Sequence, residues 1–312
     1  MAVYTEVPAE ALEAFLAGYD VGPLVMAKGI AEGVSNSNWL VETTAGRFIL
    51  TLYERRIETA DIPFFLTLMT HLADAGLPVP RPVADRAGTV LHRLRGKAAA
   101  LIQFLPGVSV SEPGPAHAQA AGEALARLHL AGASFGRARA NALGVAASAR
   151  AAGQLGERLD SLEPGLAARI ARSLVRLHAG WPGTLPRGII HADLFPDNVL
   201  FLGTRVSGLI DFYFAATDLL AYDVAVLRAA WSFSSDGRRH LPANDAALLG
   251  GYQSIRPLSK DELAALPLLG EAACLRFLLT RALDWFEQPA DALVTRKDPL
   301  AFARRLTHYA PA

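Results

Sequence analysis

A segment near the middle of the chain constrains the fold more than any other part of the sequence. The apolar residues 188–190 are followed by the polar stretch 191–197, then by apolar runs at 199–202 and 206–210, after which stands Asp211. Short apolar runs bounded by Gly, Asn and Asp are typical of strands joined by turns. The segment therefore predicts a strand, a polar loop, a hairpin, and an acidic residue where the hairpin ends.

The polar residues of this segment have a spacing that parallels the catalytic loop of kinases. His191, Asp193 and Asn198 form the pattern His-x-Asp-Leu-x-x-x-Asn, and Asp211 stands where kinases have a metal-binding Asp. Phosphoryl transfer needs an aligned hydroxyl group and metal ions that neutralise the phosphate charge. Asp193 is the predicted catalytic residue, because it would accept a hydrogen bond from the substrate hydroxyl and later take its proton. Asn198 and Asp211 are the predicted Mg²⁺ ligands, because this ion prefers oxygen. His191 is expected to support the loop through a hydrogen bond to the backbone or to Asp211.

Each of these polar residues has a simpler interpretation when it is taken alone. Asp and Asn beside Pro196 are common in turns, where their side chains bond to nearby backbone groups. The arrangement of strand, polar loop, hairpin and Asp favours a phosphotransferase site over a set of unrelated turns.

Composition limits the kinds of partner that the chain is expected to have. The 312 residues suit two lobes, and 30 basic and 30 acidic side chains give a formal net charge of zero. This balance predicts a small-molecule substrate and no binding to nucleic acid or to an anionic membrane. A single cysteine, Cys274, excludes an internal disulfide and fits a reducing cytoplasm. We expect neither a signal peptide nor a membrane span.

The first hundred residues predict a small lobe that contains a sheet. The predicted helices are residues 8–18 and 61–75, and the predicted strands are residues 24–32, 38–43, 47–53, 89–94 and 98–104. Leu105-Pro106-Gly107 follows as a natural hinge, so we place the domain boundary between residues 104 and 105.

Residues 105–312 predict a mostly helical lobe. The expected helices are residues 115–131, 164–179, 219–231, 244–252, 260–287 with a break at Pro267, and 299–307. Asp218 is expected to cap the third of these helices. The fold class is therefore α+β: a small antiparallel-sheet N-terminal lobe and a helical C-terminal lobe with an inserted catalytic hairpin, the layout of the two-lobe protein-kinase-like fold.

Several further motifs resemble the aminoglycoside phosphotransferase and choline kinase group, the small-molecule branch of the kinase-like enzymes. They are Gly76-Leu77-Pro78-Val79-Pro80, Phe104-Leu105-Pro106-Gly107 and Ala124-Leu125-Ala126-Arg127-Leu128-His129, together with the segment around Asp193. The resemblance covers most of the chain. It implies that ATP and Mg²⁺ bind between the lobes and that Asp223 braces the catalytic loop.

The same resemblance implies which residues contact the nucleotide. The loop 33–38 would cover the phosphates, with Gly33, Ser35, Asn36 and Asn38 as its contacts, although such a cluster is also typical of a simple turn. Ile49 would cover the adenine, and the backbone of Gln103 and Leu105 would bond to it.

A departure from the group occurs on the third strand. Thr51 stands where kinase-like enzymes carry a phosphate-binding Lys, and Phe65 stands in the place of its Glu partner. Loss of both members is coherent, because a lone buried Glu near phosphates is unfavourable.

Details of the sequence are similar to the bacterial homoserine kinases of this fold. The similar stretches are residues 29–34, 48–54 and 294–299. This similarity implies homoserine as substrate, whose carboxylate needs a cation. Arg276 is the favoured candidate, because the other arginine of its apolar stretch, Arg281, can pair with Asp284.

Other functions stay open on the sequence. Choline, a methylthio-sugar or an aminoglycoside are alternative substrates, although acidic and basic side chains balance in residues 212–312 and do not favour a polycationic aminoglycoside. The missing strand-three Lys also allows a nucleotide-binding pseudokinase. A monomer and a homodimer are equally compatible with the sequence.

Overall fold

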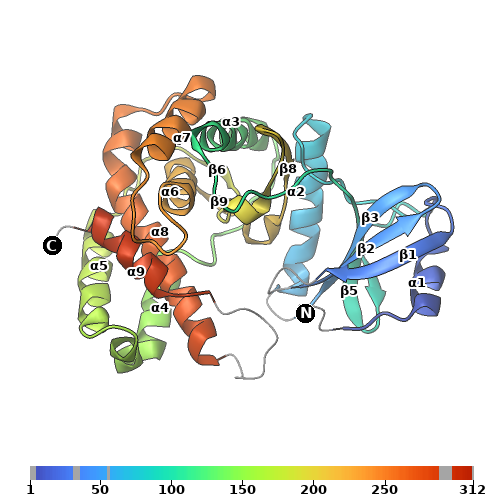
Figure 1. The fold of residues 1–312 in the computed structure, drawn as a ribbon, viewed down its shortest axis with the longest axis horizontal. Coiled ribbons are helices and arrows are strands. Elements are labelled where there is room, and N and C mark those ends of the chain that lie inside the picture. The colour runs from blue at the N-terminus through green and yellow to red at the C-terminus, as the bar shows by residue number, and fades with distance from the viewer. Residues whose placement is uncertain (1–4, 31–35, 55–56, 288–296, 311–312) are drawn as a thin grey trace. The chain divides into compact units, whose positions relative to one another are not determined.

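The computed structural model describes residues 5–30, 36–54, 57–287 and 297–310. Within them the chain divides into two compact units, of which the first extends to Pro106 and the second begins at Gly107 (Figure 1). Gly33 and Ser35 lie outside the described residues.

The first unit is built on a five-stranded antiparallel sheet with the strand order β1-β2-β3-β5-β4. Its elements are α1 (Ala9–Leu16), β1 (Leu24–Ile30), β2 (Asn36–Thr43), β3 (Gly46–Tyr53), α2 (Ile62–Asp74), β4 (His92–Leu94) and β5 (Lys97–Gln103). The antiparallel sheet confirms the fold class predicted for this part of the chain.

Alternation along β3 separates the two faces of this sheet. Leu50 and Leu52 are fully buried in a cluster that includes Leu12 and Leu16 of α1. Successive strand residues point to opposite faces, so Ile49 and Thr51 lie on the face away from this cluster. The register pairs Thr51 with Asn38 of β2.

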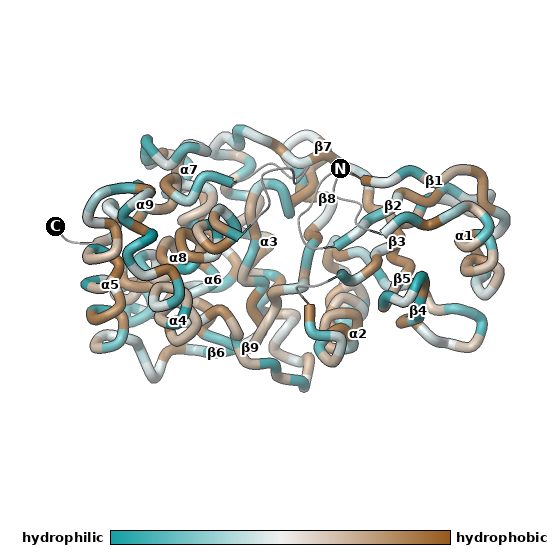
Figure 2. Tube along the Cα trace, turned by 90° about the horizontal axis from the view of Figure 1, so that it is seen from below, coloured by the Kyte–Doolittle hydropathy of each residue, from teal (hydrophilic) through white to brown (hydrophobic). Residues whose placement is uncertain are grey.

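The second unit is mostly helical and contains two short two-stranded ladders. Its helices are α3 (Pro115–Gly132), α4 (Val145–Leu155), α5 (Leu166–Gly180), α6 (Leu220–Trp231), α7 (Pro242–Ile255), α8 (Lys260–Glu287) and α9 (Leu300–Tyr309). Its strands are β6 (Arg187–Ile190), β7 (Val199–Leu202), β8 (Arg205–Leu209) and β9 (Ala216–Leu219). In Figure 2 the outer helix α5 alternates between apolar and polar colouring, because Leu166, Ile170 and Leu177 form its buried stripe.

Helix α8 is the long central helix of this unit. The predicted break at Pro267 is wrong, because the helix is continuous from Lys260 to Glu287. Burial of Leu266 and Leu269 on either side of the proline offsets the roughly 3 kcal/mol that an interior proline costs. Among the described helices α8 alone is long and apolar enough to cross a membrane, but its apolar window is 67% buried inside the unit. It is therefore a core helix.

Two elements of the second unit differ from the sequence prediction. Helix α4 was not predicted, because its many alanines favour a helix while giving little apolar periodicity. Asp218 is not a helix cap: it lies in β9, which pairs with β6, and Leu219 precedes the first residue of α6. The pairing with β6 is a tertiary interaction that a local pattern does not reveal.

Helices α3 and α7 cross with their backbones in contact. A Cβ atom at Gly122 of α3 would overlap the carbonyl oxygen of Leu248, and one at Gly251 of α7 would overlap the carbonyl oxygen of Gln119. Only glycine allows this approach, which brings His129 of α3 beside Tyr252 of α7.

Candidate active site

The polar loop after β6 is held by one carboxylate of α6. The side chain of Asp223 accepts the backbone N–H of His191 at 2.7 Å and that of Ala192 at 2.8 Å. Ala192 has φ +64°, a left-handed conformation that costs energy for a residue with a Cβ atom. The two hydrogen bonds to Asp223 hold this conformation in place.

A chain of buried hydrogen bonds continues from Asp223 into the helices behind the loop. His129 Nε2 lies 3.1 Å from Asp223 Oδ2, and His129 Nδ1 lies 2.7 Å from the hydroxyl of Tyr252. Arg256 donates to that hydroxyl at 3.1 Å and to Glu262 at 2.9 Å. Burial alone would raise the pKa of Asp223, but hydrogen bonds and charge from His129 and His191 hold it below its usual value. Asp223 is therefore an ionised, fully bonded carboxylate.

Other side chains fix the carbonyl groups of the same loop. Arg276 of α8 donates to the carbonyl oxygen of Ala192, and Trp231 of α6 donates from Nε1 to that of Leu194 at 2.8 Å. His191 Nε2 lies 3.0 Å from the carbonyl oxygen of Ile210, and His191 Nδ1 accepts the N–H of Asp193 at 3.3 Å. Burial lowers the pKa of His191. The imidazole thus links the loop to the end of β8.

Asp193 and Asn198 lie together at the open end of the loop. Asn198 Nδ2 donates to the carbonyl oxygen of Asp193 at 2.7 Å and to its Oδ2 at 3.2 Å. Asp193 is half-buried, and burial together with the charges of Asp211 and Asp197 raises its pKa to about 7, although Arg276 acts in the opposite direction. Such a carboxylate is poised to accept a proton near neutral pH.

The hairpin of β7 and β8 places Asp211 next to this pair. Ile210 donates its N–H to the carbonyl oxygen of Asn198 at 3.1 Å, which joins the end of the hairpin to its start. Asp211 itself has φ +65°. Burial and the charge of Asp197 raise its pKa to about 6, against the effect of Lys297.

The oxygen atoms of Asn198 and Asp211 fit a hard divalent cation. The amide of Asn198 is oriented by its two donated hydrogen bonds, which leaves Oδ1 available as a ligand. Burial and the charge of Asp197 raise the pKa of Asp211, and a bound cation would act in the opposite direction. The part of the chain that the structure describes contains no group of three or more His, Cys, Asp or Glu that could hold a metal. Two oxygen donors suit Mg²⁺, which takes few protein ligands and completes its shell with water and phosphate oxygens.

Three of the predicted nucleotide residues, Asn38, Ile49 and Thr51, lie on one face of the sheet in the first unit. Thr51 is only 2% exposed and donates its hydroxyl proton to Asn38 Oδ1 at 2.8 Å. Ile49 is half-buried on the same face, whereas Asn36 is buried.

At the predicted hinge, the backbone of Gln103 and that of Leu105 differ in what they can still bind. Gln103 already donates its backbone N–H to the carbonyl oxygen of Arg81 at 2.8 Å, so this donor is not free for an adenine. Within the described ranges no hydrogen bond involves the backbone of Leu105.

The residues that brace the loop without a local sequence signal are mainly buried. His129, Tyr252 and Trp231 brace the loop from helices that are remote in sequence, and no local motif shows that they do so. The guanidinium of Arg276, predicted to bind substrate, lies against the Ala192 carbonyl oxygen, and its side chain is 3% exposed.

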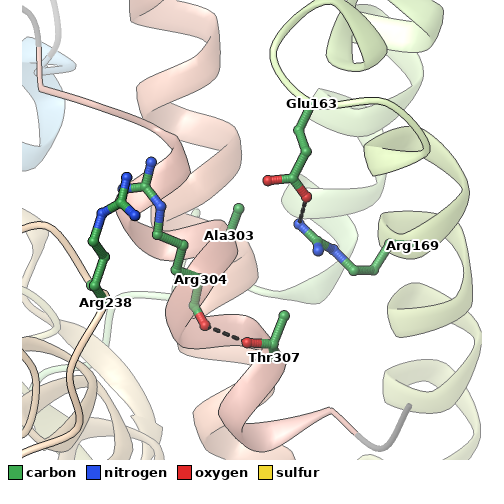
Figure 3. Close-up of a pocket in the computed structure, with 7 residues that line it drawn as sticks. Glu163, Arg169, Arg238, Ala303, Arg304 and Thr307 are labelled. Atoms are coloured by element: carbon green, nitrogen blue, oxygen red, sulfur yellow. Dashed lines mark hydrogen bonds and ion pairs between the residues drawn. The ribbon is translucent and has the colours of Figure 1, made fainter.

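A surface hollow of about 370 Å³ lies elsewhere in the second unit, between α5 and α9 (Figure 3). It is lined by Glu163, Arg169, Gly237, Arg238, Ala303, Arg304 and Thr307. None of the predicted site residues lines it, and its Arg169 is paired with Glu163 at 2.9 Å. The hollow therefore does not coincide with the predicted catalytic residues.

Comparison with known sequences identifies relatives along the whole chain. A family model described as the phosphotransferase enzyme family matches residues 27–258. A homoserine kinase of Gluconobacter oxydans (strain 621H) is 54% identical over 314 residues, covering 100% of this chain and 99% of the relative. A homoserine kinase of Xanthobacter autotrophicus (strain ATCC BAA-1158 / Py2) is 54% identical over 306 residues, covering 98% and 95%.

Solved structures share the fold at low sequence identity. An amicoumacin kinase in complex with AMP-PNP, Ca²⁺ and Ami has a TM-score of 0.69 and 16% identity, covering 95% of this chain and 91% of that one. A spectinomycin phosphotransferase in complex with ADP and spectinomycin has a TM-score of 0.69 and 12% identity, covering 98% and 96%. These similarities confirm the predicted protein-kinase-like fold.

Proposed function

The chain belongs to the phosphotransferase enzyme family, and from this premise we propose that it transfers the γ-phosphoryl group of ATP to the side-chain hydroxyl of homoserine. The observation that carries the proposal is the identity of more than half of all residues with homoserine kinases, along nearly the full length of both chains. The products are ADP and O-phosphohomoserine, which is an intermediate on the route to threonine.

Asp193 is the residue that we assign to the reacting hydroxyl. Its carboxylate accepts a hydrogen bond from the hydroxyl group and thereby directs an oxygen lone pair toward the γ-phosphorus. As the new O–P bond forms and the bond to the bridging oxygen of ADP breaks, the hydroxyl proton passes to Asp193. The raised pKa of this carboxylate, about 7, supports the role of proton acceptor.

Asn198 and Asp211 would hold Mg²⁺ through Oδ1 and a carboxylate oxygen. When bound, the ion supplies positive charge that neutralises the phosphate oxygens. The available Oδ1 of Asn198 and the half-buried carboxylate of Asp211 support this assignment.

For the nucleotide we propose that Asn38 takes over part of the task of the absent lysine. The hydroxyl of Thr51 donates to Asn38 Oδ1, so the amide is oriented with its Nδ2 group free to donate to a phosphate oxygen. An oriented amide carries less positive charge than lysine, so the metal site must neutralise more of the phosphate charge. Ile49 on the same face contacts the adenine, and the backbone of Leu105 bonds to it. The loop residues Gly33, Ser35 and Asn36 and the backbone of Gln103 stay sequence-based predictions.

A coupled assay of ADP release with purified protein tests the proposal. We expect turnover with homoserine that exceeds turnover with choline, a methylthio-sugar or an aminoglycoside. Asp193→Asn is expected to abolish ADP release while Mg·ATP binding persists in calorimetry. Absence of ADP release with homoserine would overturn the proposal, and nucleotide binding without turnover of any of these alcohols would favour a pseudokinase.

The cellular setting follows from the same proposal. We propose a soluble cytoplasmic enzyme that acts on a small molecule, without nucleic acid or membrane as partner, as a monomer or a homodimer. The balanced charge of the chain and the burial of α8 inside its unit support this view. Light scattering coupled to size-exclusion chromatography measures the oligomeric state.

A further inference from the structure

Homoserine carries an ammonium and a carboxylate besides its hydroxyl group, so its site needs a cation for the carboxylate. This requirement rests on the proposed function. The second unit contains a cluster of three aromatic rings next to the catalytic loop: Phe195, Phe277 and Phe302, with centroids 4.7 to 6.0 Å apart. Three arginines stack on these rings, namely Arg276, Arg281 and Arg305.

Two of the three arginines are committed to the backbone of the protein. Arg305 is 4% exposed and donates to the carbonyl oxygens of Ala229, Ser234 and Ser235 at 2.9 to 3.0 Å. Arg276 is 3% exposed, donates to the carbonyl oxygen of Ala192, and stacks on Phe277 at 4.5 Å. Each of these guanidinium groups therefore has a structural task and little room for a ligand.

Arg281 differs from both. Its guanidinium carbon lies over the Phe302 ring, 4.6 Å from the ring centre, which is within the range of a cation–π contact. It donates one long hydrogen bond, from Nη1 to the carbonyl oxygen of Asp298 at 3.3 Å. Within the residues that the structure describes, no carboxylate oxygen lies within 4.0 Å of a guanidinium nitrogen of Arg281. Asp284, which the sequence predicts as its partner, therefore does not pair with Arg281. A guanidinium has five N–H donors, so several remain for a ligand.

Burial and the neighbouring Arg305 both disfavour the positive charge of Arg281. The side chain is half-buried, and burial followed by repulsion from Arg305 lowers its pKa to about 10. Asp197, Asp193 and Asp298 act on it in the opposite direction without cancelling these effects. The Phe302 ring beneath Arg281 lies 6.0 Å from the ring of Phe195, which follows Asp193 by two residues, so the guanidinium lies beside the loop that carries Asp193.

Among the described residues, Lys297 is another cation near the loop. Its ammonium group pairs with Asp197 at 3.0 Å, and both side chains are more than half exposed. Its charge is therefore already balanced, and an exposed pair is a weaker ligand for a carboxylate than a stacked, half-buried guanidinium.

We propose that Arg281 binds the carboxylate of homoserine and thereby selects the amino acid over an amino alcohol that lacks the carboxylate, whereas Arg276 positions the catalytic loop. The free edge of the guanidinium offers two parallel N–H groups, which match the two oxygens of a carboxylate.

The test compares homoserine with aminopropanol, in which hydrogen replaces the carboxylate. For Arg281→Met we expect the KM for homoserine to rise about 30- to 1000-fold, which is typical of removing one partner of a bonded charge pair. The KM for ATP and the slow turnover of aminopropanol should change less than about threefold, because neither uses this contact. Calorimetry with homoserine alone should show the same loss of affinity.

Two further variants make the result specific. Arg281→Lys keeps the charge but loses the paired donors, so we expect a KM for homoserine at least about tenfold above that of the wild type. Arg158 stacks on Phe286 at 4.4 Å and is exposed, so Arg158→Met removes a stacked arginine outside the site and should leave all constants unchanged.

Failure of this inference is distinguishable from failure of the proposed function. An unaltered KM for homoserine in both Arg281 variants would overturn the role of Arg281. If Arg281→Met does not fold, the Arg281→Lys result decides alone. A wild-type protein that releases no ADP with homoserine would instead reject the proposed function.

Discussion

Asp223 and Ala192 are joined by a 2.8 Å hydrogen bond that holds a left-handed residue directly before the proposed catalytic Asp193. The other carboxylate oxygen of Asp223 accepts the N–H of His191 at 2.7 Å. Both oxygens are thus used, and the direction in which Asp193 leaves the loop depends on a side chain of another helix. The conformation of the loop is therefore determined by helix α6 and not by the loop residues alone.

Replacement of Asp223 by Asn should disrupt the loop. An amide offers one acceptor oxygen, and its NH₂ group would face a backbone N–H, which leaves a buried donor unsatisfied. We expect the free energy of unfolding to fall by about 2 to 4 kcal/mol and kcat to fall at least about tenfold. Urea denaturation and ADP release measure the two effects. Asp74→Asn is the control, because this carboxylate is 61% exposed and its pair with Arg81 contributes about 0 to 1 kcal/mol.

Replacement of Asp193 by Asn should stabilise the metal-free protein at alkaline pH while it abolishes turnover. The pKa of Asp193 is raised to about 7 in the folded protein, so between its ordinary value and pH 7 the folded state holds a proton that the unfolded state has lost. The contribution of Asp193 to the free energy of unfolding therefore falls as pH rises. At pH 8 we expect the variant to be more stable by about 1 to 2 kcal/mol, a figure reduced for the partial exposure of the group, and at pH 4 by much less.

Thermal melting with a chelator at both pH values tests this expectation. Asp236→Asn is a control of opposite sign, because the bonds from Ser234 and from the Arg238 backbone N–H hold the pKa of Asp236 below its usual value. That variant should lose stability at pH 8. A pH-independent difference between Asp193→Asn and the wild type would contradict the prediction.

The hydroxyl of Thr51 should act on the nucleotide through Asn38. Thr51→Val removes the donor that orients the Asn38 amide, so we expect the KM for ATP to rise about three- to tenfold with kcat nearly unchanged. Thr51→Ser keeps the hydroxyl and should restore the wild-type KM. Steady-state kinetics with varied ATP distinguish these outcomes, and equal constants for the Val and Ser variants would reject the role of the hydroxyl.

Two adjacent glycines of α7 should respond in opposite ways to alanine. A methyl group at Gly251 would overlap the carbonyl oxygen of Gln119, whereas the space around Gly250 is open. We expect Gly251→Ala to lower the free energy of unfolding by about 2 to 4 kcal/mol. Gly250→Ala should raise it by about 0.5 to 1 kcal/mol through better helix propensity. Urea denaturation of both proteins tests the close crossing of α3 and α7.

The sequence predicts the local elements of the fold well where a motif and a periodic pattern coincide. The hairpin that ends at Asp211 and the sheet of the first unit follow from apolar alternation and glycine turns, which are properties of neighbouring residues. Strand β9 and the continuity of α8 through Pro267 depend on burial against distant segments, so no local pattern reveals them.

The same distinction applies to the site. Asp193, Asn198 and Asp211 are predicted from their spacing in one segment, whereas His129 and Tyr252 act through hydrogen bonds that span the chain. Helical spacing favours Arg276 over Arg281 as the carboxylate ligand, whereas the hydrogen bonds of the folded protein favour Arg281. The decision depends on which guanidinium already meets a carbonyl group, and this is a property of the folded loop.

Arg276 and Arg281 stand on one uninterrupted helix, where an axial rise of about 7.5 Å separates their backbone positions. One end of this interval fixes the loop that carries Asp193, and the other presents the proposed carboxylate ligand. This rigid spacing sets the distance between the group that receives the substrate hydroxyl and the group proposed to bind the substrate carboxylate. A substrate with one methylene group fewer or more than homoserine would contact either Asp193 or Arg281, but not both at once. We therefore expect the enzyme to discriminate between substrates by their chain length.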